Sequence, residues 1–155
     1  METEGRPRVK LTHRELRLNN VVSLRMDLHD GDELLEIIDA TVDEFGRALV
    51  NNGYYTTGPM VFRGLPDSRE LTIMTTLGNR VNLVGREGTG FEFRERLDLE
   101  TEFFYRHVDV EESVPYAEIG EAVAAAGFRV ENIYHVILDV FGDTILDLYV
   151  EAEKL

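Results

Sequence analysis

The sequence of 155 residues contains no cysteine and no tryptophan, and its only lysines are Lys10 and Lys154. Without cysteine the chain can form no disulfide, no zinc site with thiolate ligands and no cysteine nucleophile. No apolar run reaches the roughly 18–20 residues that a membrane-spanning helix needs. The first residues, Met1–Arg8, lack the apolar core of a secretory signal. We therefore expect a cytoplasmic protein that does not associate with membranes.

Positive charge is also scarce. Lysine and arginine together number 16 against 30 aspartates and glutamates, so the formal net charge is −14 at pH 7. Proteins that bind nucleic acids hold the phosphates with clustered lysine and arginine side chains. We therefore expect no nucleic-acid partner. The interpretation that we favour for the acidity is solubility through self-repulsion. The alternative is a ligand or a protein partner that carries positive charge.

Apolar residues make up 43% of the sequence, which is enough to form a packed core. At this length we expect one domain over residues 1–155. Its first half, about 16–80, has the pattern strand, helix, strand, strand. The strand lies around Val21–Met26, the helix runs from about Asp32 to Asn52, and the last two strands lie near Pro59–Gly64 and Arg69–Leu77.

The second half, about 91–153, repeats this plan after a glycine-rich linker at about 78–90. Alternation over Phe91–Leu99 predicts a further strand or an extended one, before the strand that ends at Phe103–Val108. A helix over Pro115–Ala126 and strands near Ile133–Val140 and Thr144–Glu151 follow. The fold class that this predicts is α+β. Two βαββ units would form a pseudo-twofold curved antiparallel sheet with two outer helices and a central cleft, where small ligands usually bind.

Helical spacing also predicts which side chains pack against the sheet. The predicted inward side chains are Leu34, Ile38, Val42, Phe45, Leu49, Ile119 and Val123. In the last strand Leu146, Leu148 and Val150 alternate with Asp147 and Tyr149, so we expect Asp147 on the face away from the helix.

Four segments resemble the GyrI-like, or bacterial effector-binding, superfamily, which is built by duplication of an SHS2 unit: Arg106–Val108, Pro115–Gly120, Gly127 and Asp147–Val150. The first half, through Asn20–Ser23 and Asn52–Pro59, is similar to an uncharacterised set of small stand-alone bacterial proteins that share this fold. The resemblance extends from about Leu16 to Glu151. It implies a pocket between the concave faces of the two half-sheets.

Members of this superfamily bind hydrophobic and often cationic compounds through aromatic walls and a buried glutamate. The matching position here is Asp147, whose side chain is one methylene shorter and reaches less far. Glu95 is a second candidate acid, because it is in register with Phe91, Phe93 and Leu97. The expected walls of the pocket are aromatic: Tyr149, Tyr105, Phe103, Tyr54 and Tyr134. Each tyrosine could instead fill part of the core and point its hydroxyl at water.

Histidines and acids elsewhere have simpler interpretations. The segment His29–Glu33 contains capping acids rather than metal ligands, because consecutive residues at such a turn seldom converge on one ion. His107 and His135 are interpreted as structural histidines, and the alternative is an acid–base pair with an aspartate across the strands. We expect no metal and no cofactor.

The function that we favour is a stand-alone, non-enzymatic protein that binds an amphipathic or cationic small molecule in the cleft between the halves. One alternative is a hydrolase of an electrophilic small molecule, with Asp147 as the base and Tyr149 or Tyr134 as the proton donor. Another is an immunity or accessory protein whose acidic surface covers a basic protein partner. The sequence assigns no oligomeric state.

Overall fold

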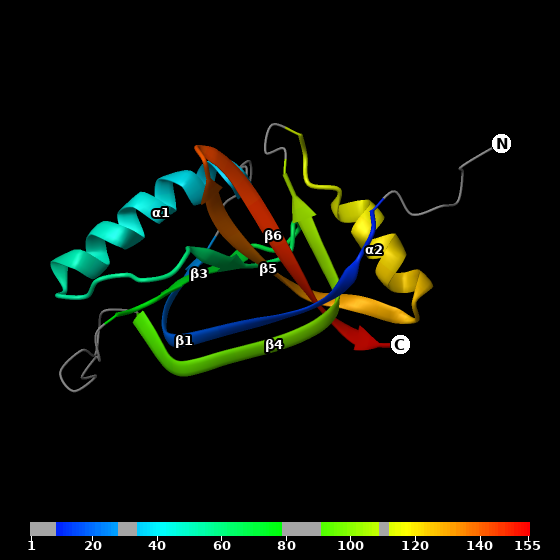
Figure 1. The fold of residues 1–155 in the computed structure, drawn as a ribbon, viewed down its shortest axis with the longest axis horizontal. Coiled ribbons are helices and arrows are strands. Elements are labelled where there is room, and N and C mark those ends of the chain that lie inside the picture. The colour runs from blue at the N-terminus through cyan, green and yellow to red at the C-terminus, as the bar shows by residue number, and fades with distance from the viewer. Residues whose placement is uncertain (1–8, 28–33, 79–90, 109–111) are drawn as a thin grey trace. The chain divides into compact units, whose positions relative to one another are not determined.

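The computed structural model describes residues 9–27, 34–78, 91–108 and 112–155, and for residues 34–39 it describes the backbone alone. The elements are β1 (Thr12–Asp27), α1 (Leu34–Asn51), β2 (Val61–Arg63), β3 (Glu70–Thr76), β4 (Phe91–His107), α2 (Tyr116–Ala125), β5 (Phe128–Val140) and β6 (Asp143–Lys154) (Figure 1). The chain is therefore α+β and mostly antiparallel sheet, with the order strand, helix, strand, strand occurring twice. The predicted linker and the predicted capping acids fall outside the described residues.

The chain divides into two compact units. We call Arg17–Asp98 the α1 unit, and Met1–Leu16 together with Leu99–Leu155 the α2 unit. Both boundaries fall inside strands, so β1 and β4 each contribute to both units. The predicted pseudo-twofold axis and central cleft stay predictions.

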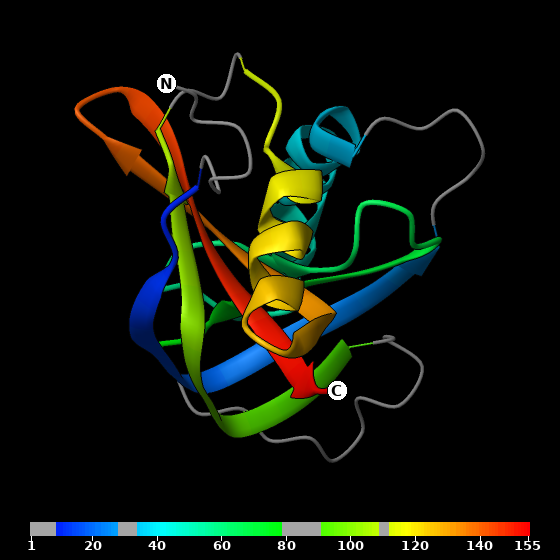
Figure 2. The same cartoon turned by 90° about the vertical axis from the view of Figure 1, so that its right-hand side faces the viewer.

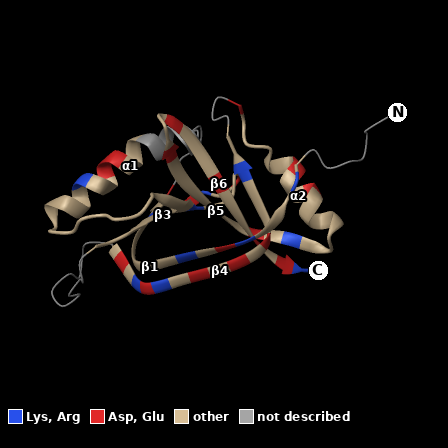
Figure 3. Ribbon diagram, in the orientation of Figure 1, with Lys and Arg blue, Asp and Glu red and all other residues tan. Residues whose placement is uncertain are grey.

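Strands β1 and β4 are both long. The first begins at Thr12 rather than near Val21, and β4 is one extended strand of 17 residues, which is the second of the two possibilities that the sequence left open for Phe91–Leu99. No glycine or proline interrupts residues 91–107, and charged residues alternate along much of this strand (Figure 3). An uninterrupted period of two is compatible with one continuous strand.

In the α1 unit the strand order is β1–β3–β2, and both pairings are antiparallel. The register places Leu24 opposite Ile73, and Phe62 opposite Ile73 on the other side. Helix α1 packs on the sheet face that carries Leu24 and Ile73. The shared core contains the buried side chains of Val22, Phe45, Leu49, Tyr54, Ile73 and Leu77.

In the α2 unit the order is β4–β6–β5, again antiparallel. In each unit the last of the three strands therefore lies between the first and the second. Helix α2 packs against β5 (Figure 2) and buries Ile119 and Val123 completely. On the sheet, Leu148 and Val150 are also fully buried.

The predicted inward side chains of both helices are confirmed where they are described. Phe45, Leu49, Ile119 and Val123 are at most 2% exposed, and Val42 is half-buried against the core of the α1 unit. The side chains of Leu34 and Ile38 lie outside the described part of the chain.

A two-residue turn joins β5 to β6 in a hairpin. Val140 pairs with Asp143, and the two residues between them have positive φ, 52° at Phe141 and 85° at Gly142. Positive φ at both central residues is the geometry of a type I′ turn, which matches the twist of the flanking strands. The Phe141 side chain is fully exposed.

Candidate functional site

Asp147, the acid that the sequence singled out, forms a two-point ion pair with Arg106 in the α2 unit. The register of β4 and β6 places the two residues directly opposite each other. Arg106 Nε donates to Oδ1 at 2.7 Å and an Nη donates to Oδ2 at 2.9 Å. The Asp147 side chain is 4% exposed and that of Arg106 is 44% exposed. The hydrogen bond and the negative charge of Asp147 raise the pKa of Arg106, so the guanidinium stays charged.

Asp147 lies on the sheet face that the alternation of β6 predicted. Leu148, its neighbour, is opposite His135, and His135 is bonded to Tyr116 at the start of α2. The face of Leu148 is thus the face that α2 covers. Asp147 points to the other side, which we call the far face of the α2 unit.

Aromatic side chains form the next row of this far face. Phe104 and Tyr134 are both opposite Tyr149, one on each side of β6. The rings of Phe104 and Tyr149 have centroids 5.0 Å apart. The guanidinium of Arg14 lies over the Phe104 ring at 4.7 Å, within the range of a cation–π contact.

Burial raises the pKa of Tyr149, the nearby charge of Asp147 raises it further, and the charges of Arg14 and Arg106 oppose the shift. The net direction is upward, so Tyr149 keeps its proton and offers a hydroxyl rather than a phenolate.

Two of the predicted wall residues do not share this face. Tyr105 is opposite Leu148, and Phe103 packs against Phe128 with ring centroids 5.4 Å apart. Both are immediate neighbours of Phe104 along β4, and successive side chains point to opposite faces. The structure therefore brings Tyr134 and Tyr149 to the face of Asp147 and directs Phe103 and Tyr105 to the opposite one.

The remaining two candidates belong to the α1 unit. Tyr54 is 5% exposed within the core beneath α1, and its ring meets Phe93 edge-on at 5.7 Å. Glu95 is exposed on β4, so water solvates its carboxylate. The ligand-binding roles of Glu95 and Tyr54 stay predictions.

Both strand histidines have structural partners, as we expected. His135 is fully buried and its Nε2 is 2.8 Å from the hydroxyl of Tyr116. His107 Nε2 lies 2.9 Å from the backbone oxygen of Glu112. Burial raises the pKa of Tyr116 to about 12. The bond from Tyr116 to His135 ties the first turn of α2 to β5.

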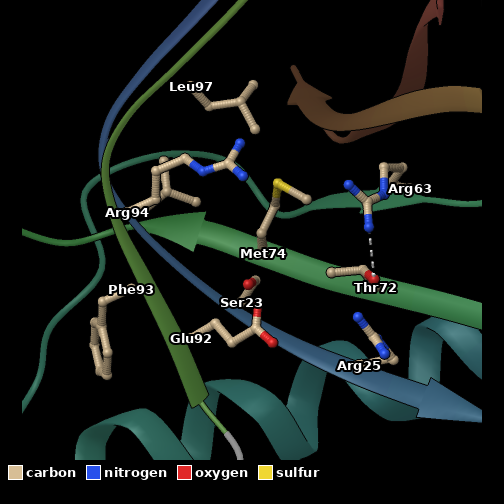
Figure 4. A pocket seen from close by; sticks show the side chains of 10 residues that line it. Ser23, Arg25, Arg63, Thr72, Met74, Glu92, Phe93, Arg94 and Leu97 are labelled. Atoms are coloured by element: carbon tan, nitrogen blue, oxygen red, sulfur yellow. Dashed lines mark hydrogen bonds between the residues drawn. The ribbon is translucent and has the colours of Figure 1, made fainter.

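A pocket of about 310 Å³ lies on the sheet face of the α1 unit that is turned away from α1, which we call the open face. The register explains which residues line it, since Ser23 is opposite Met74, and Thr72 is opposite both Arg25 and Arg63. Residues from β4 complete the lining. The charged residues of the pocket are Arg25, Arg63, Glu92 and Arg94 (Figure 4).

The rest of the lining is apolar or carries hydroxyl groups. Val21, Met74, Phe93 and Leu97 supply the apolar surface, and Ser23 and Thr72 supply the hydroxyls. Such a lining can accept an apolar body and donate hydrogen bonds to its polar end. No pattern in the sequence predicted this pocket. The alternation of β1 had set Ser23 and Arg25 apart from the core, but it could not show which side chains of other strands join them.

Among the described residues, no group of three or more histidines and acids is arranged to hold a metal ion. No helix in the described ranges is both long enough and apolar enough to cross a membrane.

No family model matches the chain, and no curated protein matches its sequence. Solved structures do resemble it. The C-terminal domain of EcmrR superposes with a TM-score of 0.64 at 12% identity, over 96% of this chain and 99% of that domain. Two hydrolase structures from Listeria innocua have TM-scores of 0.42 and 0.39 at 13% identity, over 92% and 93% of this chain and 93% and 94% of theirs. The chain therefore has the fold of the EcmrR domain.

Proposed function

We propose that the chain is a small-molecule binding protein and that its ligand occupies the pocket on the open face of the α1 unit. The observation that carries this is the pocket itself, whose volume of about 310 Å³ is within the range of small-molecule sites. The fold shared with the EcmrR domain agrees with the GyrI-like, effector-binding resemblance of the sequence. Both support binding of a small molecule.

The far face of the α2 unit is a second candidate surface. Phe104, Tyr134 and Tyr149 lie there, but each is at most 7% exposed, so they leave little aromatic area for a ligand. A cationic ligand at Asp147 would compete with Arg106, because the guanidinium already engages both carboxylate oxygens. The same contact removes the free carboxylate that the hydrolase alternative needs. No contact among the described residues favours the hydrolase or the protein-partner alternative, so we propose binding without chemistry.

A test fills the pocket with a larger side chain. Ser23→Phe places a ring on the open face, and Ser113→Phe makes the same change at an exposed position outside the pocket. Two amphipathic probes of opposite charge, naphthoate and naphthylmethylammonium, are added and the melting temperature is recorded. A ligand that binds only the folded state raises this temperature.

We expect at least one probe to stabilise the parent and Ser113→Phe, and to leave Ser23→Phe unchanged. Equal stabilisation of Ser23→Phe and the parent would show that the probes bind elsewhere. No stabilisation by either probe would contradict the proposed function.

A further inference from the structure

The charge of the open-face pocket is opposite to that of the chain. Acidic residues outnumber lysine and arginine by 30 to 16 in the whole sequence. In the pocket, Arg25, Arg63 and Arg94 come from three different strands and Glu92 is the single acid of the lining. The fold thus brings together positive charges that are far apart along the sequence.

The ion pair of Arg25 in this pocket is weak. Arg25 is 3.9 Å from Glu70, and both side chains are more than 60% exposed. An exposed pair at this distance is weak and is screened by salt. Arg63 donates to the neutral hydroxyl of Thr72 at 3.5 Å. Because guanidinium groups do not lose their proton in proteins, the positive charge persists at every physiological pH.

Apolar side chains lie beside the guanidinium groups. Figure 4 shows the Met74 side chain between the guanidinium groups of Arg63 and Arg94. Met74, Leu97 and Val21 are 2%, 6% and 3% exposed, so they form a firm apolar wall. A ligand that contacts both the guanidinium groups and the apolar wall carries an acidic group on an apolar body. The planar fork of arginine matches carboxylate and phosphate oxygens in particular.

We infer that this pocket selects a small organic anion, a carboxylate or a phosphate ester, with its acidic group on Arg25 and Arg94 and its apolar body on Met74 and Leu97. This inference rests on the proposed function and names its ligand class. It also replaces, for this pocket, the cationic ligand that the family resemblance implied.

The test compares probes that share one ring system and differ in charge. Naphthoate, naphthyl phosphate and naphthylmethylammonium are titrated by calorimetry into the parent, Arg94→Gln, Arg94→Lys and Arg47→Gln. Arg47 is the matched control, because it lies on α1 outside this pocket and pairs with Asp43 at the surface. A melting curve of each variant verifies that it is folded. If Arg94→Gln does not fold, Arg25→Gln replaces it in the titrations.

We expect one or both anionic probes to bind the parent and the ammonium probe not to bind. The stronger of naphthoate and naphthyl phosphate identifies the acidic group. Arg94→Gln should weaken anion binding about tenfold or more, as loss of a charged hydrogen-bond partner does. Arg94→Lys should restore part of this loss, and Arg47→Gln should bind as the parent does. Added salt should weaken the binding.

Two results would overturn the inference. If the ammonium probe binds, Ser23→Phe abolishes its binding and neither anion binds, the pocket is a small-molecule site but not an anion site. If the anions bind Arg94→Gln and Arg25→Gln as tightly as the parent, the arginines do not select the ligand. Absence of binding by all three probes would instead contradict the proposed function itself.

Discussion

Arg106 and Asp147 face each other across β4 and β6 and share two hydrogen bonds, 2.7 and 2.9 Å long. The carboxylate is buried, while the guanidinium is partly exposed. A buried charge is costly unless it is paired and hydrogen-bonded. The pair therefore makes an acid tolerable within the sheet of the α2 unit, and it gives Asp147 a structural role that any ligand there would have to disturb.

Arg106→Ala should lower the free energy of unfolding by about 2–3 kcal/mol, because it leaves the Asp147 carboxylate buried and unpaired. Urea unfolding at neutral pH measures this loss. The control is Arg129→Ala, which removes an exposed, solvent-screened pair with Glu153 and should cost clearly less than Arg106→Ala. Equal losses in the two variants would show that burial of Asp147 adds nothing to the pair.

Tyr116 should make the protein lose stability in alkali. Its pKa is about 12 in the folded protein against 10 in the unfolded chain, so its contribution is complete below pH 10 and is lost as the pH rises to about 12. The loss amounts to about 2–3 kcal/mol across this window. Unfolding measured at several alkaline pH values should show a shallower decline in Tyr116→Phe. The exposed control Tyr55→Phe should follow the parent, and a decline in Tyr116→Phe as steep as in the parent would contradict the assignment.

Phe45→Ala should cost about 3–5 kcal/mol, since the ring is 2% exposed and meets Phe91 edge-on at 6.0 Å. Chemical denaturation gives the value. Val50→Ala on the same helix truncates a side chain that is 65% exposed, so it should change stability by less than about 0.5 kcal/mol. A loss at Phe45 of less than about 1 kcal/mol would mean that α1 does not present this face to the sheet.

Phe141→Asn should stabilise the protein by about 0.5–1 kcal/mol. Residue 141 has a φ of 52°, which asparagine tolerates better than phenylalanine, and the exposed ring contributes no packing. Asp143→Asn, one position beyond the turn, serves as the control without a positive φ. A lower melting temperature in Phe141→Asn would show that the ring has a stabilising contact of its own.

Local patterns in the sequence predicted much of the fold. The helical spacing of Phe45 and Leu49, and of Ile119 and Val123, predicted both helices and their buried faces. The alternation around Asp147 predicted the correct face of β6. These features depend only on neighbouring residues, and periodicity reports on those directly.

The site depended on long-range pairing that periodicity does not contain. Arg106 and Asp147 are 41 positions apart, and their contact follows from the register of β4 and β6. A shift of that register by one residue would have placed Tyr105 beside Asp147. The pocket on the open face was harder still to predict, because its three arginines come from strands that lie far apart in the sequence.

The most direct measurement is an amide chemical-shift map of isotopically labelled protein during a titration with naphthoate. The account predicts that the largest changes occur at Ser23, Thr72, Met74 and Arg94, around the pocket, and that exposed positions of α1 such as Arg47 barely move. It also predicts that these changes disappear in Ser23→Phe. A map with no change at the pocket residues, or one centred on α1, would contradict the claim that the open face of the α1 unit is the ligand site.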